Sequence, residues 1–68
     1  MAFTEAQRTV LTQVGVKDVD AAERAIEESN YKEPILANIA RMMSNPQSTG
    51  TTLRALLENT PGVDLHVE

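Results

Sequence analysis

The sequence predicts an all-α protein: a small bundle of three to four short helices with a C-terminal extended tail or strand. Apolar residues recur at helical spacing in four stretches, turn-forming residues separate the stretches, and strand-like alternation is clearest in the last eight residues, "PGVDLHVE". The 68 residues allow one domain. We expect a three-helix core over residues 1–45, a polar linker over 46–50, a short fourth helix over 51–60 and an extended tail over 61–68.

The first expected helix lies in "FTEAQRTVLTQVG". Thr4 followed by Gln7 is the signature of a capping box, and Gly15 is a suitable stop. One stripe then holds Phe3, Ala6, Val10, Leu11 and Val14. A strand is the alternative for residues 9–16, because β-branched residues alternate there.

The second expected helix lies in "DVDAAERAIEESN". Either Asp20, with Glu23, or Asp18 can cap its start, and Asn30 can end it in the left-handed conformation. Asp20 and Arg24 have the acid-first spacing that suits an ion pair. The apolar stripe is narrow and consists of Val19, Ala22, Ala25 and Ile26.

The third expected helix lies in "YKEPILANIARMMSNP". Pro34 suits the first helical position, and Pro46 ends the helix. The apolar stripe consists of Ile35, Leu36, Ile39, Met42 and Met43. We expect Ile35, Leu36, Ile39 and Met43 to form the centre of the core, packed against Val10, Leu11, Val14 and Ile26.

The fourth expected helix follows the polar stretch "SNPQSTG" and lies in "TTLRALLEN". Thr51 or Thr52 is its expected cap, and its apolar face holds Leu53, Leu56 and Leu57. The linker is long for a tight bundle connection, so we expect this helix to dock loosely or elsewhere.

The tail has three competing interpretations. It can be disordered, as termini often are, or it can pair inside the chain with residues 9–16. It can also pair with another chain by adding a strand. For that case we prefer a symmetric dimer in which the fourth helix and tail of each copy meet their equivalents.

Charge and composition exclude several classes of protein. The formal net charge is −4, and the basic residues are scattered, which makes a nucleic-acid surface unlikely to form. A helix-turn-helix DNA reader stays a remote alternative for three short helices. No stretch is apolar enough to cross a membrane, no signal peptide is visible, and there is no cysteine, which fits a cytoplasmic protein.

Few residues are suited to chemistry. His66 is the sole histidine, and on a strand it shares a face with Asp64 and Glu68, so a weak surface metal contact is conceivable. The ordinary interpretation is the polar face of a terminal strand. The hydroxyl groups lie at helix caps or in the linker, away from a base. We therefore expect no enzyme activity, no cofactor and no dedicated metal site.

The stretch "LTQVGV" begins a short run of family-like features. Ala22, Ala25 and Ile26 follow it, and Leu36 comes ten residues after Ile26. From residue 11 to 40 this pattern resembles a ubiquitin-associated domain, a three-helix module, in which a Met-Gly-Phe loop stands where this chain has Val14, Gly15 and Val16. The resemblance implies that these three residues contact a partner, helped by the end of the third helix.

These observations predict a non-catalytic protein–protein interaction module, or a small accessory or inhibitor protein that acts by binding another protein. A homodimer is one such assembly, and a ubiquitin-associated-like binding domain is an alternative. The candidate protein-binding residues are the two adjacent methionines, of which one can be exposed to a partner, the apolar face of the fourth helix and the apolar face of the tail: Met42, Met43, Leu53, Leu56, Leu57, Val63, Leu65 and Val67.

Overall fold

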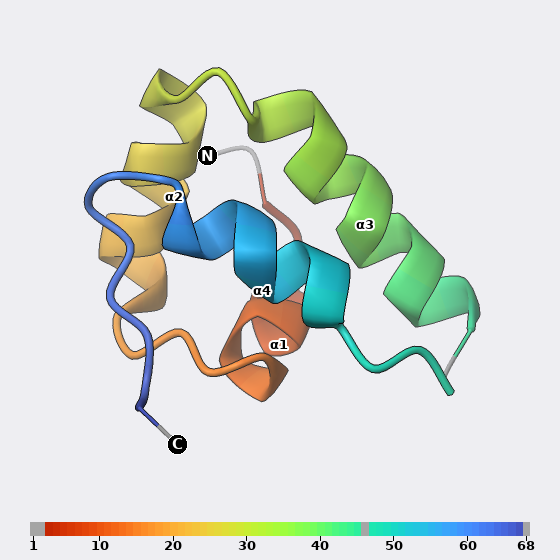
Figure 1. Ribbon diagram of the computed structural model, residues 1–68. Coiled ribbons are helices and arrows are strands. Elements are labelled where there is room, and N and C mark those ends of the chain that lie inside the picture. Colours follow the sequence, from red (N-terminus) through yellow and green to blue (C-terminus); the bar gives the residue numbers. More distant parts are fainter. Residues whose placement is uncertain (1–2, 46, 68) are drawn as a thin grey trace.

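The computed structural model describes residues 3–45 and 47–67, and this part of the chain forms four helices without a strand (Figure 1). The helices are α1 (Glu5–Gln13), α2 (Val19–Glu28), α3 (Lys32–Ser44) and α4 (Thr51–Glu58). The predicted all-α class is confirmed.

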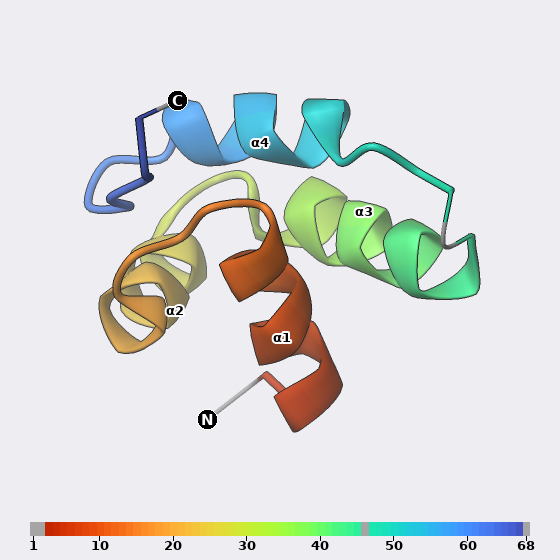
Figure 2. The same cartoon turned by 90° about the horizontal axis from the view of Figure 1, so that it is seen from below.

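Helix α3 packs against each of the other three helices, and α1 also packs against α2. Figure 2 shows α4 lying across the layer that α1, α2 and α3 form. The resulting globule measures 28 × 28 × 19 Å. The fold therefore has one shared interior rather than a core with a separate fourth helix.

The interior is built from large aliphatic side chains that all four helices contribute. Those with almost no exposed surface are Leu11, Ile26, Ile35, Ile39, Leu53 and Leu57. Loose docking of α4 is therefore a wrong prediction, because Leu53 and Leu57 lie one turn apart and both enter the common core. Met43 does not reach the core centre, whereas its neighbour Met42 packs against the core.

Helix α1 begins and ends as its sequence predicts. The Thr4 side chain accepts from the Gln7 backbone N–H at 3.2 Å, and the Gln7 side chain accepts from the Thr4 N–H at 2.8 Å. At the other end the Gly15 N–H donates to Thr12 and the Val16 N–H to Leu11, with Gly15 at φ 106°. This is a Schellman motif, and it makes the strand alternative for residues 9–13 wrong.

The starts and stops of the later helices differ from the predictions in detail. Asp18, not Asp20, caps α2 and accepts from the Ala21 N–H at 3.2 Å. Ser29 follows α2 as its C-cap, and Asn30 has no left-handed conformation. Pro34 is the third residue of α3, where its missing N–H is still harmless because the first four N–H groups have no intrahelical partner. Pro46 lies outside the described residues.

Gly50 is the N-cap of α4, in place of the predicted threonines. Its φ is 77°, and a Cβ atom there would lie 2.9 Å from Val14 Cγ1 and 3.0 Å from Met42 Cε. A glycine is needed here for two reasons. It adopts a positive φ without strain, and it leaves room for the backbone to pass between Val14 and Met42 before α4 begins.

The tail is ordered and pairs inside the chain. Val16 and Leu65 form an isolated antiparallel bridge, in which the Lys17 N–H donates to the Asp64 carbonyl at 2.9 Å and the His66 N–H donates to the Gly15 carbonyl at 2.8 Å. Disorder is thus a wrong prediction for residues 63–67. The internal pairing is confirmed, although its partner is the loop after α1 rather than a strand over residues 9–16.

Arg54 of α4 stabilises the pairing between the tail and the loop after α1. Its guanidinium donates to the Val14 carbonyl at 2.8 Å and to the His66 carbonyl at 2.6 Å, and its Nε lies 3.5 Å from the Glu58 carboxylate. The first of these carbonyls belongs to the end of α1, where the helix dipole favours a cation. One side chain therefore ties α4, α1 and the tail together.

We expect Ile39→Ala to abolish or nearly abolish cooperative thermal unfolding. Truncating a fully buried isoleucine typically costs about 2–5 kcal/mol, and a chain of this size gains only about 3–5 kcal/mol from its core. Circular dichroism melting curves give the measurement, with the exposed Met43→Ala on the same helix as the control. A melting midpoint near the parent's would show that α3 is peripheral.

We expect Arg54→Lys to loosen the tail while the helices persist. A lysine cannot offer the planar fork that serves two carbonyls at once. Protection of the Lys17 and His66 amides from hydrogen exchange should fall by about tenfold or more. Arg41→Lys, on the exposed side of α3, is the matched control. Unchanged protection in the Arg54 variant would contradict the role assigned to Arg54.

Candidate functional site

A groove runs between α1 and the end of α3. Four residues of α1 line one wall at the spacing of a single helix face: Ala6, Thr9, Val10 and Gln13. Met42, Met43 and Ser48 line the other wall. The hollow has a volume of about 430 Å³, which is within the range of roughly 300–1,000 Å³ for binding clefts. We call these seven residues the α1–α3 groove.

The two methionines of the groove wall differ in how deeply they are buried. Adjacent residues on a helix point about 100° apart, so only one of the pair can face the interior fully. Met42 is half-buried against the core, and Met43 is 46% exposed. Since methionine is flexible and polarisable, Met43 is a side chain that can adapt to an apolar contact.

The α1–α3 groove carries no charge. None of its seven lining residues is ionisable, although charged residues make up 24% of the chain. Five of the eight exposed acids among the described residues lie between residues 18 and 33: Asp18, Asp20, Glu27, Glu28 and Glu33. The uncharged lining of the groove therefore contrasts with the charged stretch around α2, where the exposed Lys17 and Arg24 lie among the acids.

The structure separates the sequence-predicted binding residues into three groups. Leu53 and Leu57 are fully buried, so their assignment to a binding surface is wrong. Leu56, Val63 and Leu65 are half-buried against the core. Met43 and Val67 are exposed, at 46% and 91%, and only Met42 and Met43 lie together in the groove.

Sequence reasoning missed the α1 wall of the groove. The four residues Ala6, Thr9, Val10 and Gln13 have the spacing of one helix face, but Thr9 and Gln13 are polar and lie outside the predicted apolar stripe. Only Val10 is buried there. The groove depends on which helix neighbours α1, and this is a property of the fold.

A second hollow of about 390 Å³ lies beside the first and shares Gln13 with it. Arg54 and Glu58 line it. Both are already occupied, because Arg54 holds two backbone carbonyls and lies 3.5 Å from the Glu58 carboxylate. The charged side chains that line this hollow are therefore already committed to contacts within the chain.

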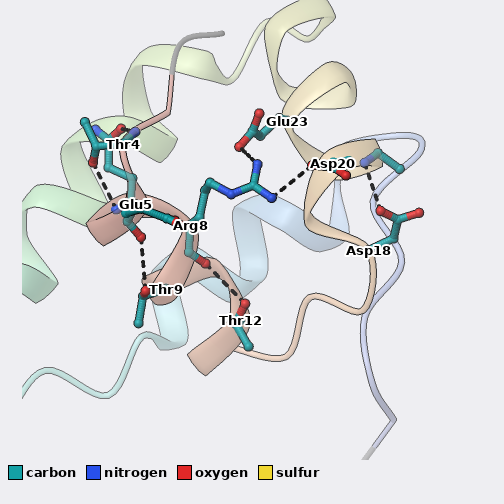
Figure 3. Close-up of polar contacts among 10 residues, drawn as sticks. Thr4, Glu5, Arg8, Thr9, Thr12, Asp18, Asp20 and Glu23 are labelled. Carbon is teal, nitrogen blue, oxygen red and sulfur yellow. Dashed lines mark hydrogen bonds and ion pairs between the residues drawn. The ribbon is translucent and has the colours of Figure 1, made fainter.

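The densest charge cluster links α1 to α2 (Figure 3). The Arg8 guanidinium donates to the Glu23 carboxylate, and it donates to Asp20 Oδ1 at 2.9 Å. These hydrogen bonds, with Asp20 first, raise the pKa of Arg8 above its usual value. Glu23 is 4% exposed, so its carboxylate is buried with Arg8 as its charged partner. The expected pairing of Asp20 with Arg24 is wrong, since Asp20 meets Arg8.

The loop that resembles the ubiquitin-associated contact site is covered. Val14 and Val16 are 8% and 3% exposed, and the tail hydrogen-bonds to Gly15. The loop therefore does not offer the exposed apolar contact that the resemblance implies.

His66 and Asp64 are exposed on the tail, while Glu68 lies outside the described residues. Within residues 3–45 and 47–67, no three side chains of the metal-binding types come together. No helix in that part of the chain has the length and hydrophobicity needed to cross a bilayer. No protein-family model, curated protein or solved structure matches the chain.

We expect Arg8→Ala to lower the melting midpoint by several degrees, and by more than Asp20→Ala does. Loss of Arg8 leaves the Glu23 carboxylate buried without a charged partner, whereas Asp20 is exposed. The double variant Arg8→Ala/Glu23→Ala should recover part of the loss in a double-mutant cycle. Strictly additive changes in the cycle would show that the ion pair does not couple α1 to α2.

Proposed function

We propose that this protein is a non-catalytic interaction module that binds another protein in the α1–α3 groove. The observation that carries the proposal is the half-exposed Met43 beside an uncharged hollow of about 430 Å³. Methionine is favoured at adaptable binding surfaces, and a hollow of this size is typical of a binding cleft.

The lining of the groove defines the chemistry of the partner segment. A groove between two helices suits the apolar face of an amphipathic helix, whose anchors recur at helical spacing. Since no charged residue lines the groove, the anchors that enter it are themselves uncharged. Thr9, Gln13 and Ser48 supply hydrogen-bonding groups at the rim, which can orient the segment.

The mode of action follows from binding alone. By filling the groove, the partner segment is withdrawn from its other contacts, so this protein acts as an accessory or inhibitor that occludes or bridges. A cytoplasmic location is part of the proposal, and the cysteine-free sequence is consistent with it.

The test compares proteins captured from host lysate by the parent chain and by two groove variants, Met43→Glu and Met43→Lys. An uncharged anchor predicts that both variants lose the same captured protein by about tenfold or more. Tyr31→Glu is the matched control, because Tyr31 is 39% exposed and lies in the loop between α2 and α3.

Three results would contradict the proposal. Equal capture by the parent and both Met43 variants would exclude the groove. Loss with only one sign of charge would show that the partner segment is charged. Turnover of a substrate by the purified chain would exclude a purely binding role.

A further inference from the structure

The two edges of the tail are used differently. Asp64 and His66 point their backbone groups toward the Gly15–Lys17 loop and Arg54. Backbone groups of successive strand residues point to opposite edges, so those of Leu65 point away from that loop. Among the described residues, neither the Leu65 N–H nor its carbonyl has a hydrogen-bond partner. The tail therefore presents a free outer edge, and Figures 1 and 2 both show it at the periphery of the molecule.

The sequence of this edge is complementary to itself. If two tails run antiparallel with Leu65 opposite the partner's Leu65, then Val63 faces the partner's Val67 and Asp64 faces the partner's His66. The apolar residues meet on one face, and the imidazole and carboxylate meet on the other, where a ring N–H can donate to the carboxylate. A shift by one residue would put apolar side chains opposite polar ones.

This register also uses the backbone groups that the folded chain leaves free. The Leu65 residues would exchange their N–H···O bonds, and each Val67 N–H would reach the partner's Val63 carbonyl. The Val63 N–H is not needed, since it already donates to the Thr60 carbonyl at 3.3 Å.

The exposed side chain of Val67 also favours association with a second tail. Val63 and Leu65 pack against the core, but Val67 is 91% exposed. The alternation of apolar residues in the tail therefore continues beyond the part that packs on the core. In the antiparallel register, the partner's Val63 lies opposite Val67 and supplies the missing cover.

We propose that two copies of this chain associate as a symmetric dimer through residues 63–67, with Leu65 on the two-fold axis. Each tail then lies between its own Gly15–Lys17 segment and the partner's tail, in a short four-stranded antiparallel arrangement that is stronger than the isolated bridge. This proposal does not depend on the α1–α3 groove, which lies between other elements.

The dimer is weak. The chain exposes 4365 Å², and a compact monomer of 7.4 kDa exposes roughly 4,200 Å², so the fold does not need a partner to bury its core. Five residues a side bury much less than the standard interface of about 1,600 Å². Association therefore belongs to the high-micromolar-to-millimolar range.

The first test is sedimentation equilibrium over that concentration range with a charge swap. His66→Asp places the new carboxylate opposite the Asp64 carboxylate of the other copy, at both symmetry-related positions. This repulsion should weaken the dimer by about tenfold. The double variant Asp64→His/His66→Asp restores an acid opposite an imidazole and should restore the dimer. Melting midpoints of dilute samples should stay unchanged, since neither side chain is buried in the folded chain.

The second test reads the register directly. Val63 and Val67 of one chain are about 13 Å apart along an extended strand, beyond the reach of a methyl–methyl nuclear Overhauser effect. An isotope-filtered spectrum of mixed labelled and unlabelled chains should show this contact between copies. The proposal is overturned if the parent chain stays monomeric at millimolar concentration. It is also overturned if the dimer tolerates His66→Asp, or if the filtered contact joins other residues, as it would in an exchange of whole helices.

Discussion

The fold depends on burying Ile35 and Ile39 of α3 against all three of the other helices. Helix α3 is the element that contacts α1, α2 and α4 alike, and these two isoleucines have no exposed surface. Leu11, Ile26, Leu53 and Leu57 converge on them from the neighbouring helices. The chain has so few large apolar residues that it forms a single core at this point. The helix caps, the Val16–Leu65 bridge and the Arg54 contacts hold the four short helices around this core.

Local signals in the sequence were sufficient for the elements but not for their assembly. The capping box at Thr4, the stop at Gly15 and the stripe of α3 each act within a few residues, so they could be predicted. The Gly50 cap could not, because the close approach of Val14 and Met42 requires it. The same reasoning applies to the candidate site. The adjacent pair Met42 and Met43 indicated that one methionine can be exposed, but Met43 was expected at the core centre, and packing decides that it is the exposed one. The α1 wall opposite it forms a groove only through the packing of α1 near the end of α3.

The exposed acids, the α1–α3 groove and the outer edge of the tail lie on different elements of the fold. Most of the exposed acids lie between residues 18 and 33, the uncharged groove lies between α1 and the end of α3, and the unpaired strand edge belongs to the tail. Arg54, which could have been a binding residue, is committed to backbone carbonyls of the chain itself. Because the α1–α3 groove and the tail edge use different elements, the two proposed associations would not compete for the same surface.

The position of Arg54 and the tail in the chain has a consequence for protein synthesis. The Val14 carbonyl accepts a hydrogen bond from a donor that comes 40 residues later, and Arg54 and the tail together cover the loop beside it. A nascent or prematurely terminated chain that lacks α4 would leave the apolar faces of α1 and α3 open to water, and proteases act readily on such incomplete folds. Only a chain that carries both α4 and the tail covers its own interior, so any chain that lacks either element exposes apolar surface.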